Sequence, residues 1–294
     1  MGKIANISVQ IALIVISLYL FAFLLSWKVS ILITVVIYSH ELGHALSAMR
    51  RKIRVRGIYM LPPLGAATAL ESKGLYCRKD EAWVNLMGPA TTIILCLPCF
   101  AIFAFTGNKY LVASAGLIAA INLMNLIPLM PFDGGMIVYS IMSSVVKDIR
   151  KRKNIFFLSN ISLITILSFA GLFYSLNLMF FALIAAIYSK SQLKLMDEEK
   201  EKQRAIIIKN SISEQIKREE EYSYPDEAYI KFLKKGAEDA EKYLEENPIK
   251  IEMSKREVVQ NTVSYFSVVL ILLIYIKYSI SVVGWDFVKI ALTG

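Results

Sequence analysis

Residues 29–49 read VSILITVVIYSHELGHALSAM, an apolar run that ends in two histidines and a glutamate. A helix of about 20 residues spans roughly 30 Å, the thickness of the hydrocarbon layer of a membrane. His40 and His44 stand four residues apart, so both imidazoles lie on one helix face and can share a metal ion. Glu41 is next to the first histidine, where a carboxylate can take a proton from metal-bound water. Ionisable groups inside a span are costly unless they have a function, which favours a metal site over a chance match.

The rest of the chain is also too apolar for an ordinary soluble domain. Of its 294 residues 56% are hydrophobic and the mean hydropathy is +0.52, whereas soluble domains are about 45–50% apolar. We expect an all-α polytopic membrane protein with about seven transmembrane helices. The predicted spans are residues 7–27, 29–49, 82–105, 110–130, two helices within 155–189 that separate near Gly171 or Asn177, and 262–283.

The loop charges predict an orientation. Lys and Arg crowd into residues 50–56 and 147–153, and such clusters mark cytoplasmic loops. The chain is therefore expected to be a multi-pass protein of the cell membrane, with its N-terminus in the cytoplasm and its C-terminus outside. This distribution also explains the net charge of +9 without a nucleic-acid partner.

The composition divides the chain into three parts. The predicted parts are a membrane-embedded domain over 1–189 with its core at about 29–146, a charged cytoplasmic helical region over 190–261, and a last transmembrane helix with a short tail over 262–294. Between Pro225 and Pro248, apolar residues recur at helical spacing, which predicts an amphipathic helix. The charged region is either a solvated helical hairpin or a module that docks a cytoplasmic partner.

A catalytic zinc needs a further ligand, because such sites have three protein ligands and an open position for water. The chain has no third histidine, and Cys96 and Cys99 lie toward the opposite end of their span. Asp133 follows the fourth span in NLIPLMPFDGG, residues 125–135, where two prolines and two glycines break the helix. We therefore predict Asp133 as the third ligand of one Zn²⁺ per chain. The alternative carboxylates, all in the loop before the third span, are Glu71, Asp80 and Glu81.

The two motifs together resemble the site-2 protease family of intramembrane metalloproteases. H-E-x-x-H stands at 40–44 and N-x-x-P-x-x-P-x-D-G at 125–134, in the order expected for that family. The resemblance covers about residues 29–146 and implies a three-helix metalloprotease core. It also implies roles for individual residues. These are zinc ligation by His40, His44 and Asp133, general base catalysis by Glu41, and positioning of the scissile carbonyl by Asn125.

Weaker similarities lie between the motifs. LPPLG at residues 61–65 resembles the membrane-dipping loop of the family, which implies that Gly65 helps to position the substrate. Gly88-Pro89 resembles a G-P pair in the family's next helix. The prolines and glycine in 58–70 exclude a continuous helix, and we expect the flanks of this segment to form an edge strand that pairs with an extended substrate.

The function expected from these residues is hydrolysis of peptide bonds in or near the membrane. The substrate would be a membrane-spanning or membrane-associated peptide, such as a membrane-tethered regulator or a small peptide precursor. One alternative is a catalytically inactive zinc-binding scaffold or chaperone-like binding protein. Another is a zinc transporter, but the outer halves of the spans hold no His, Asp or Glu before Asp286.

Overall fold

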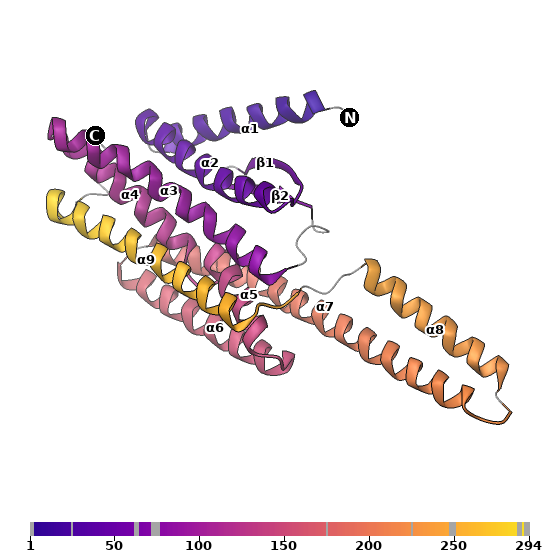
Figure 1. Cartoon of the computed structure of the whole chain (residues 1–294). Helices are drawn as coiled ribbons and strands as arrows, with labels where there is room; N and C mark the ends of the chain where they lie inside the picture. Colours follow the sequence, from indigo (N-terminus) through magenta and orange to yellow (C-terminus); the bar gives the residue numbers. More distant parts are fainter. Residues whose placement is uncertain are drawn as a thin grey trace. The chain divides into compact units, whose positions relative to one another are not determined.

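The computed structural model of the chain is mostly helical, with one two-stranded sheet (Figure 1). It describes all residues except 1–2, 25, 62–64, 72–76, 175, 225, 247–250, 287–289 and 291–294. The chain divides into two compact units, Met1–Val145 with Glu252–Gly294, and Val146–Ile251. The predicted boundaries at 189/190 and 261/262 fall inside continuous helices, Leu176–Glu220 and Lys255–Val283, and the division into three parts stays a prediction.

The first unit holds the predicted core. Its elements are α1 (Lys3–Leu24), α2 (Trp27–Arg50), β1 (Val55–Leu61), β2 (Gly65–Leu70), α3 (Arg78–Thr106), α4 (Lys109–Asn125), α5 (Asp133–Val145) and α9 (Lys255–Val283). Helix α3 packs against α2, α4 and α5, and α9 runs along α4 (Figure 1). Helix α4 ends at Asn125, short of the predicted 110–130, because Pro128 and Pro131 have no N–H group with which to continue it.

Local signals fix the ends of several helices. The Ser26 hydroxyl accepts from the backbone N–H of Val29 and caps α2. Ser254 and Glu257 form a reciprocal capping box at the start of α9. Helix α3 ends at Gly107, whose φ of 65° is in the left-handed region that glycine adopts without strain.

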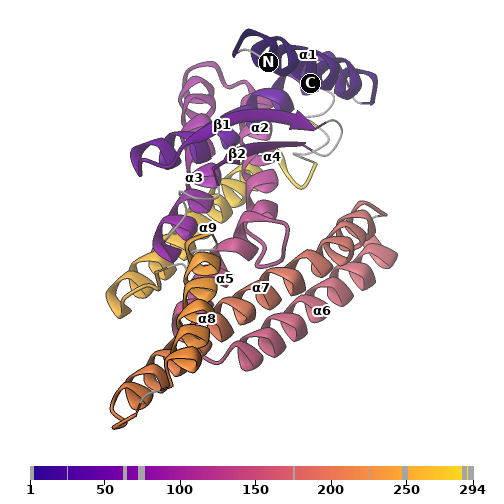
Figure 2. The same cartoon turned by 90° about the vertical axis from the view of Figure 1, so that its right-hand side faces the viewer.

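The segment between α2 and α3 is a β-hairpin. Strands β1 and β2 are antiparallel, with Ile58 opposite Thr68, and the hairpin lies beside α2 (Figure 2). Gly65 opens β2 with a φ of +118°, which only glycine adopts readily. Pro62 and Pro63, which were expected to break the helix here, lie outside the described residues. The strand expected within residues 58–70 is thus present, and it is paired with a second strand in the hairpin.

The described residues of the second unit form three helices, α6 (Ile149–Tyr174), α7 (Leu176–Glu220) and α8 (Glu227–Glu246). The backbone N–H groups of Lys151 and Arg150 donate to the Asp148 carboxylate, which caps α6 and holds the pKa of Asp148 below its usual range. Helix α6 is described up to Tyr174 and α7 from Leu176, and residue 175, beside the predicted break near Gly171 or Asn177, lies outside the described residues.

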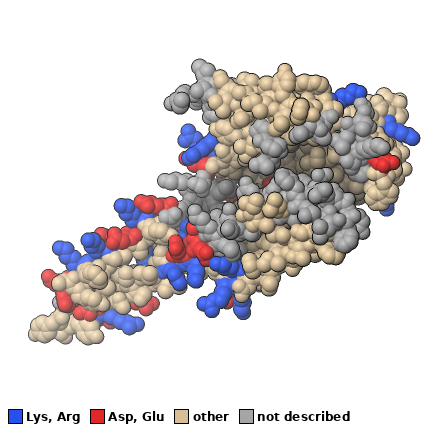
Figure 3. Space-filling view, turned by 180° about the vertical axis from the view of Figure 1, so that it is seen from behind, with Lys and Arg blue, Asp and Glu red and all other residues tan. Residues whose placement is uncertain are grey.

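Helix α8 occupies the region predicted to be amphipathic and packs on α7 through a stripe that includes buried Leu233. Acidic and basic side chains gather over α7 and α8, as Figure 3 shows. Ion pairs also tie α6 to α7, including Arg152 with Glu199 at 2.9 Å and Lys153 with Asp197 at 2.8 Å.

Among the described residues, three helices are long and apolar enough to cross a membrane, namely α2, α3 and α9. A shorter apolar helix covers Ser8–Phe23. The protein is therefore a mostly helical membrane protein, and the total of seven crossings stays a prediction.

Candidate metal centre

Three predicted ligands converge between α2 and the start of α5. His40 Nε2 lies 2.9 Å from Asp133 Oδ2 and 3.0 Å from His44 Nε2. His44 Nε2 lies 3.5 Å from the same carboxylate oxygen. Both histidines are buried and Asp133 is half-buried. The helix break after α4 places Asp133 at the first position of α5, so its side chain meets the α2 histidines across 93 residues of sequence.

The outer nitrogens of both imidazoles have fixed partners. His44 Nδ1 lies 2.7 Å from the Val84 carbonyl, which can only accept, so this nitrogen carries the proton. His40 Nδ1 lies 2.8 Å from Asn122 Oδ1. The Asn122 amide nitrogen donates to the Ile118 carbonyl at 2.8 Å, which fixes the orientation of the amide and makes Oδ1 the acceptor. Both Nδ1 atoms therefore donate, and both Nε2 lone pairs face inward.

This donor set fits zinc. Two inward lone pairs and a carboxylate oxygen repel one another unless a cation lies between them. Two atoms that share a tetrahedral zinc are roughly 3.3 Å apart, and the three separations here are 2.9, 3.0 and 3.5 Å. Imidazoles that donate their other N–H to a carbonyl or amide are typical of metal sites. His40, His44 and Asp133 are thus the residues that would hold the ion.

Two glycines bring α3 against the histidines. A Cβ at Gly88 would come against the ring atoms of both His40 and His44. A Cβ at Gly43, on α2, would come against the Met87 carbonyl and the Thr91 hydroxyl of α3. Each helix therefore has a glycine where the other approaches most closely, which lets the Val84 carbonyl of α3 reach His44.

Glu41 is next to the metal ligand His40 in sequence, and a hydroxyl from the β-hairpin holds its side chain by a hydrogen bond. The Thr68 hydroxyl lies 2.7 Å from Glu41 Oε2 and 3.0 Å from the Glu41 carbonyl oxygen, and it donates to the nearer carboxylate oxygen. Glu41 is buried, so this hydrogen bond fixes its carboxylate within a low-dielectric site. No sequence pattern marked Thr68, because the contact depends on the fold of β2 over α2.

The alternative carboxylates have other partners. Glu71, Asp80 and Glu81 each face an arginine, and Glu81 also accepts from the Ser140 hydroxyl at 2.8 Å. The pairs are Glu71 with Arg56 at 3.6 Å, Asp80 with Arg51, and Glu81 with Arg78 at 2.9 Å. The two cysteines of the apolar C-x-x-C sequence are free thiols against backbone carbonyls, with Cys96 buried in a hydrophobic cluster. Within the described part of the chain, the candidate metal cluster is the His40, His44 and Asp133 group.

Comparison with known proteins finds one family match and a similar solved structure. Residues 28–117 match the family model of peptidase family M50. Over this segment the chain is similar to peptidase family M50. M50 peptidases are zinc metalloproteases, and the site-2 proteases are among them. A site-2 protease from Methanocaldococcus jannaschii is similar in structure, with 22% identity, a TM-score of 0.45, and coverage of 62% of this chain and 87% of the other. No curated protein matches the chain.

The M50 match includes the first motif but ends before the second. It covers His40, Glu41 and His44, whereas Asp133 joins them through the geometry described above. Asn125, expected to position the substrate, is the last residue of α4 and is half-buried. Asn122, one turn earlier, contacts His40 and was missed, although a fully buried amide in an apolar run is itself a signal of a partner.

We expect Asn122→Ala to weaken zinc binding about 10- to 100-fold, the usual effect of removing a partner that orients a ligand. His40 would lose the acceptor that fixes its Nδ1 proton. Zinc affinity, measured by competition with a chelator on the purified protein, tests this. The control is Asn108→Ala at the other end of α4, which removes an exposed capping side chain that accepts a hydrogen bond from the Tyr110 backbone N–H. Equal zinc affinity in the Asn122 variant and the wild type would contradict the assignment.

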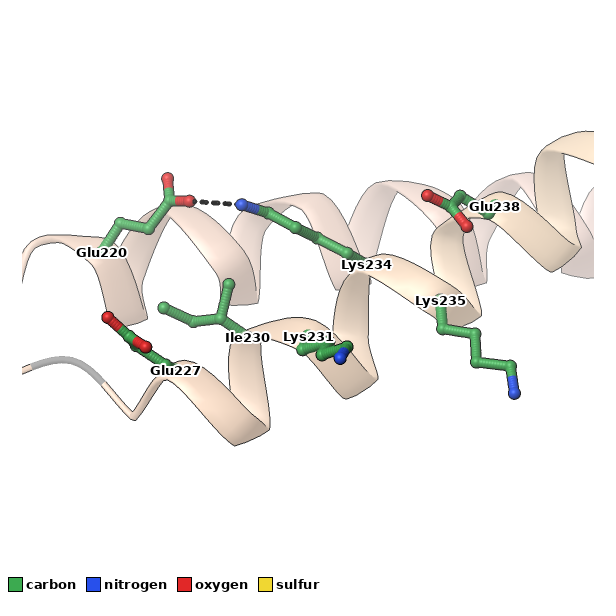
Figure 4. A pocket seen from close by; sticks show the side chains of 7 residues that line it. All are labelled: Glu220, Glu227, Ile230, Lys231, Lys234, Lys235 and Glu238. Atoms are coloured by element: carbon green, nitrogen blue, oxygen red, sulfur yellow. Dashed lines mark hydrogen bonds and ion pairs between the residues drawn. The ribbon is translucent and has the colours of Figure 1, made fainter.

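The second unit has a pocket of a different kind. It has a volume of about 790 Å³ and lies between the end of α7 and the start of α8. Figure 4 shows its mixed charges and the ion pair from Lys234 to Glu220, 3.1 Å long. Its lining residues are Glu220, Glu227, Ile230, Lys231, Lys234, Lys235 and Glu238. It has no histidine or cysteine, and its acidic and basic groups balance, so it does not resemble a catalytic site.

Proposed function

We propose that this chain is an intramembrane zinc endopeptidase, with one zinc per chain held by His40, His44 and Asp133. The main support is the convergence of two imidazole lone pairs and one carboxylate oxygen beside a buried glutamate. A set of this kind is typical of catalytic zinc sites with three protein ligands.

Glu41 is the proposed base. When zinc is bound, it lowers the pKa of a water molecule toward 7 and polarises a peptide carbonyl. Glu41 accepts the proton of that water at its carboxylate and later donates it to the leaving amine. The Thr68 hydroxyl restricts the rotation of the Glu41 carboxylate. Asn125 and Gly65 are proposed to position the scissile peptide.

The proposed substrate is a membrane-spanning or membrane-associated peptide that becomes extended at the site. A helical peptide keeps its carbonyls in its own hydrogen bonds, so it must unwind before hydrolysis. The β1–β2 hairpin, hydrogen-bonded to Glu41 through Thr68, offers a strand edge for such a segment. Membrane-tethered regulators and small peptide precursors both fit this description.

We further propose a multi-pass topology in the cell membrane with seven crossings, the N-terminus in the cytoplasm and the C-terminus outside. This orientation puts the basic residues of 50–56 and 147–153 in the cytoplasm. It also puts the charged helices of 190–261 there, where they are available to a cytoplasmic partner. An inactive zinc-binding scaffold would not need Glu41, whereas here Glu41 is buried and held by a specific hydrogen bond.

Metal removal tests the proposal. The full-length protein, purified in detergent, is incubated with a panel of synthetic transmembrane peptides, and the products are identified by mass spectrometry. We expect cleavage that is lost after treatment with a chelator and restored by zinc but not by magnesium, whose preferred ligands are oxygens. Cleavage that continues unchanged after complete metal removal would contradict a zinc mechanism.

A further inference from the structure

Helix α9 belongs to the same packed core as the metal site. It runs along α4 and also contacts α3 and α5. Its side chains share one hydrophobic cluster with residues of those three helices, among them Leu86, Ala119 and Ile137. The sequence motifs ended at α5, so nothing in them indicated that a helix more than 100 residues later would complete this core.

One hydrogen bond links α9 to the break that precedes Asp133. The Tyr265 hydroxyl donates to the Leu126 carbonyl at 2.5 Å, and Tyr265 is 7% exposed. Leu126 caps the end of α4, where backbone carbonyls lose their partners from the next turn. A buried carbonyl without a donor is costly, so the tyrosine hydroxyl stabilises the chain in this broken conformation.

The same carbonyl supports the first turn of α5. A Cβ at Gly134 would come against the carbonyl groups of Leu126 and Ile127. The backbone next to Asp133 therefore rests directly on the peptide group that Tyr265 holds. Movement of the Leu126 peptide would move Gly134, and Asp133 Oδ2 would leave its place 2.9 Å from His40 Nε2.

We propose that Tyr265 is a positioning residue for the metal site, which fixes the Asp133 ligand through the Leu126 peptide group. This role rests on the proposed zinc function of His40, His44 and Asp133. It makes α9 a required part of the metal centre, although α9 contributes no ligand.

The test is Tyr265→Phe, which removes only the hydroxyl. Zinc affinity of the full-length protein is measured by competition with a chromogenic chelator, with His44→Ala as the variant without a complete site. We expect the phenylalanine variant to bind zinc about two- to tenfold more weakly, the range for loss of one buried hydrogen bond. Zinc dissociation should be faster by a similar factor.

Ser279→Ala is the matched control. The Ser279 hydroxyl also donates from α9 to an α4 carbonyl, that of Val112 at 2.9 Å, and Ser279 is 0% exposed. Val112 lies near the start of α4 and Leu126 at its end, so the two bonds join the same helices at opposite ends. Both variants should lower the melting temperature, but only Tyr265→Phe should change zinc affinity.

A second variant tests the contact from the other side. Gly134→Ala inserts a Cβ against the Leu126 carbonyl and should also weaken zinc binding. Wild-type zinc affinity in both Tyr265→Phe and Gly134→Ala, with zinc lost in His44→Ala, would overturn the positioning role and leave the zinc site standing. Equal zinc binding by the wild type and His44→Ala would overturn the proposed function and this inference together.

Discussion

Glu41→Gln is expected to abolish peptide cleavage while the protein keeps its zinc. General acid–base catalysis contributes about 10²- to 10⁴-fold, so the turnover rate should fall by at least about 100-fold. The side-chain amide oxygen of glutamine can still accept from the Thr68 hydroxyl, so the local geometry should survive. Glutamine cannot take a proton from water at neutral pH, and this is the property that the substitution removes.

The measurement pairs cleavage of the best peptide substrate with the zinc content of the same preparation. Glu71→Gln is the control, because it makes the same change at a partly exposed glutamate that follows β2 and faces Arg56. It should leave both zinc content and turnover near wild type. Substantial cleavage by the Glu41 variant would show that another group serves as the base.

Asp133→Ala should cost both zinc and activity. Removing a partner that only orients a ligand lowers metal affinity about 10- to 100-fold. Removing the anionic ligand itself should therefore lower zinc affinity by more than about 100-fold. Asp133→Asn should retain weak binding through its amide oxygen. Membrane insertion should be unchanged, because the loss of one carboxylate does not weaken an apolar span.

Asp80→Ala separates this assignment from its alternatives. Asp80 was another candidate ligand, and it pairs with Arg51. The Asp80 variant should keep its zinc when measured by metal analysis beside the Asp133 variant. Zinc that is lost from the Asp80 variant and kept by the Asp133 variant would place the third ligand at Asp80, in the first turn of α3.

The sequence predicted the parts of the site that depend on local spacing. His40 and His44 meet because a helix repeats about every four residues, and the prolines after Asn125 predicted a helix break. The end of α4 was misplaced by a few residues. Apolar composition continues through such positions, and packing decides where each helix ends.

Contacts between distant segments could not be predicted in the same way. Thr68 reaches Glu41 only after the hairpin folds over α2, and Tyr265 reaches Leu126 across 139 residues. Neither residue type is unusual in its position. Asn122 is different, because an amide inside an apolar helix needs a partner, and that requirement is visible in the sequence.

The paired glycines at the α2–α3 crossing also bear on how a substrate of the proposed protease would reach the metal site. With Gly43 against the Met87 carbonyl and Gly88 against both imidazoles, this side has no room for a third polypeptide backbone. The two helices form a closed wall behind the histidines. We expect a peptide substrate of the proposed protease to enter past the β1–β2 hairpin or the 126–132 segment, so crosslinkers placed on those two segments should capture a bound peptide where crosslinkers on α2 and α3 at this crossing do not.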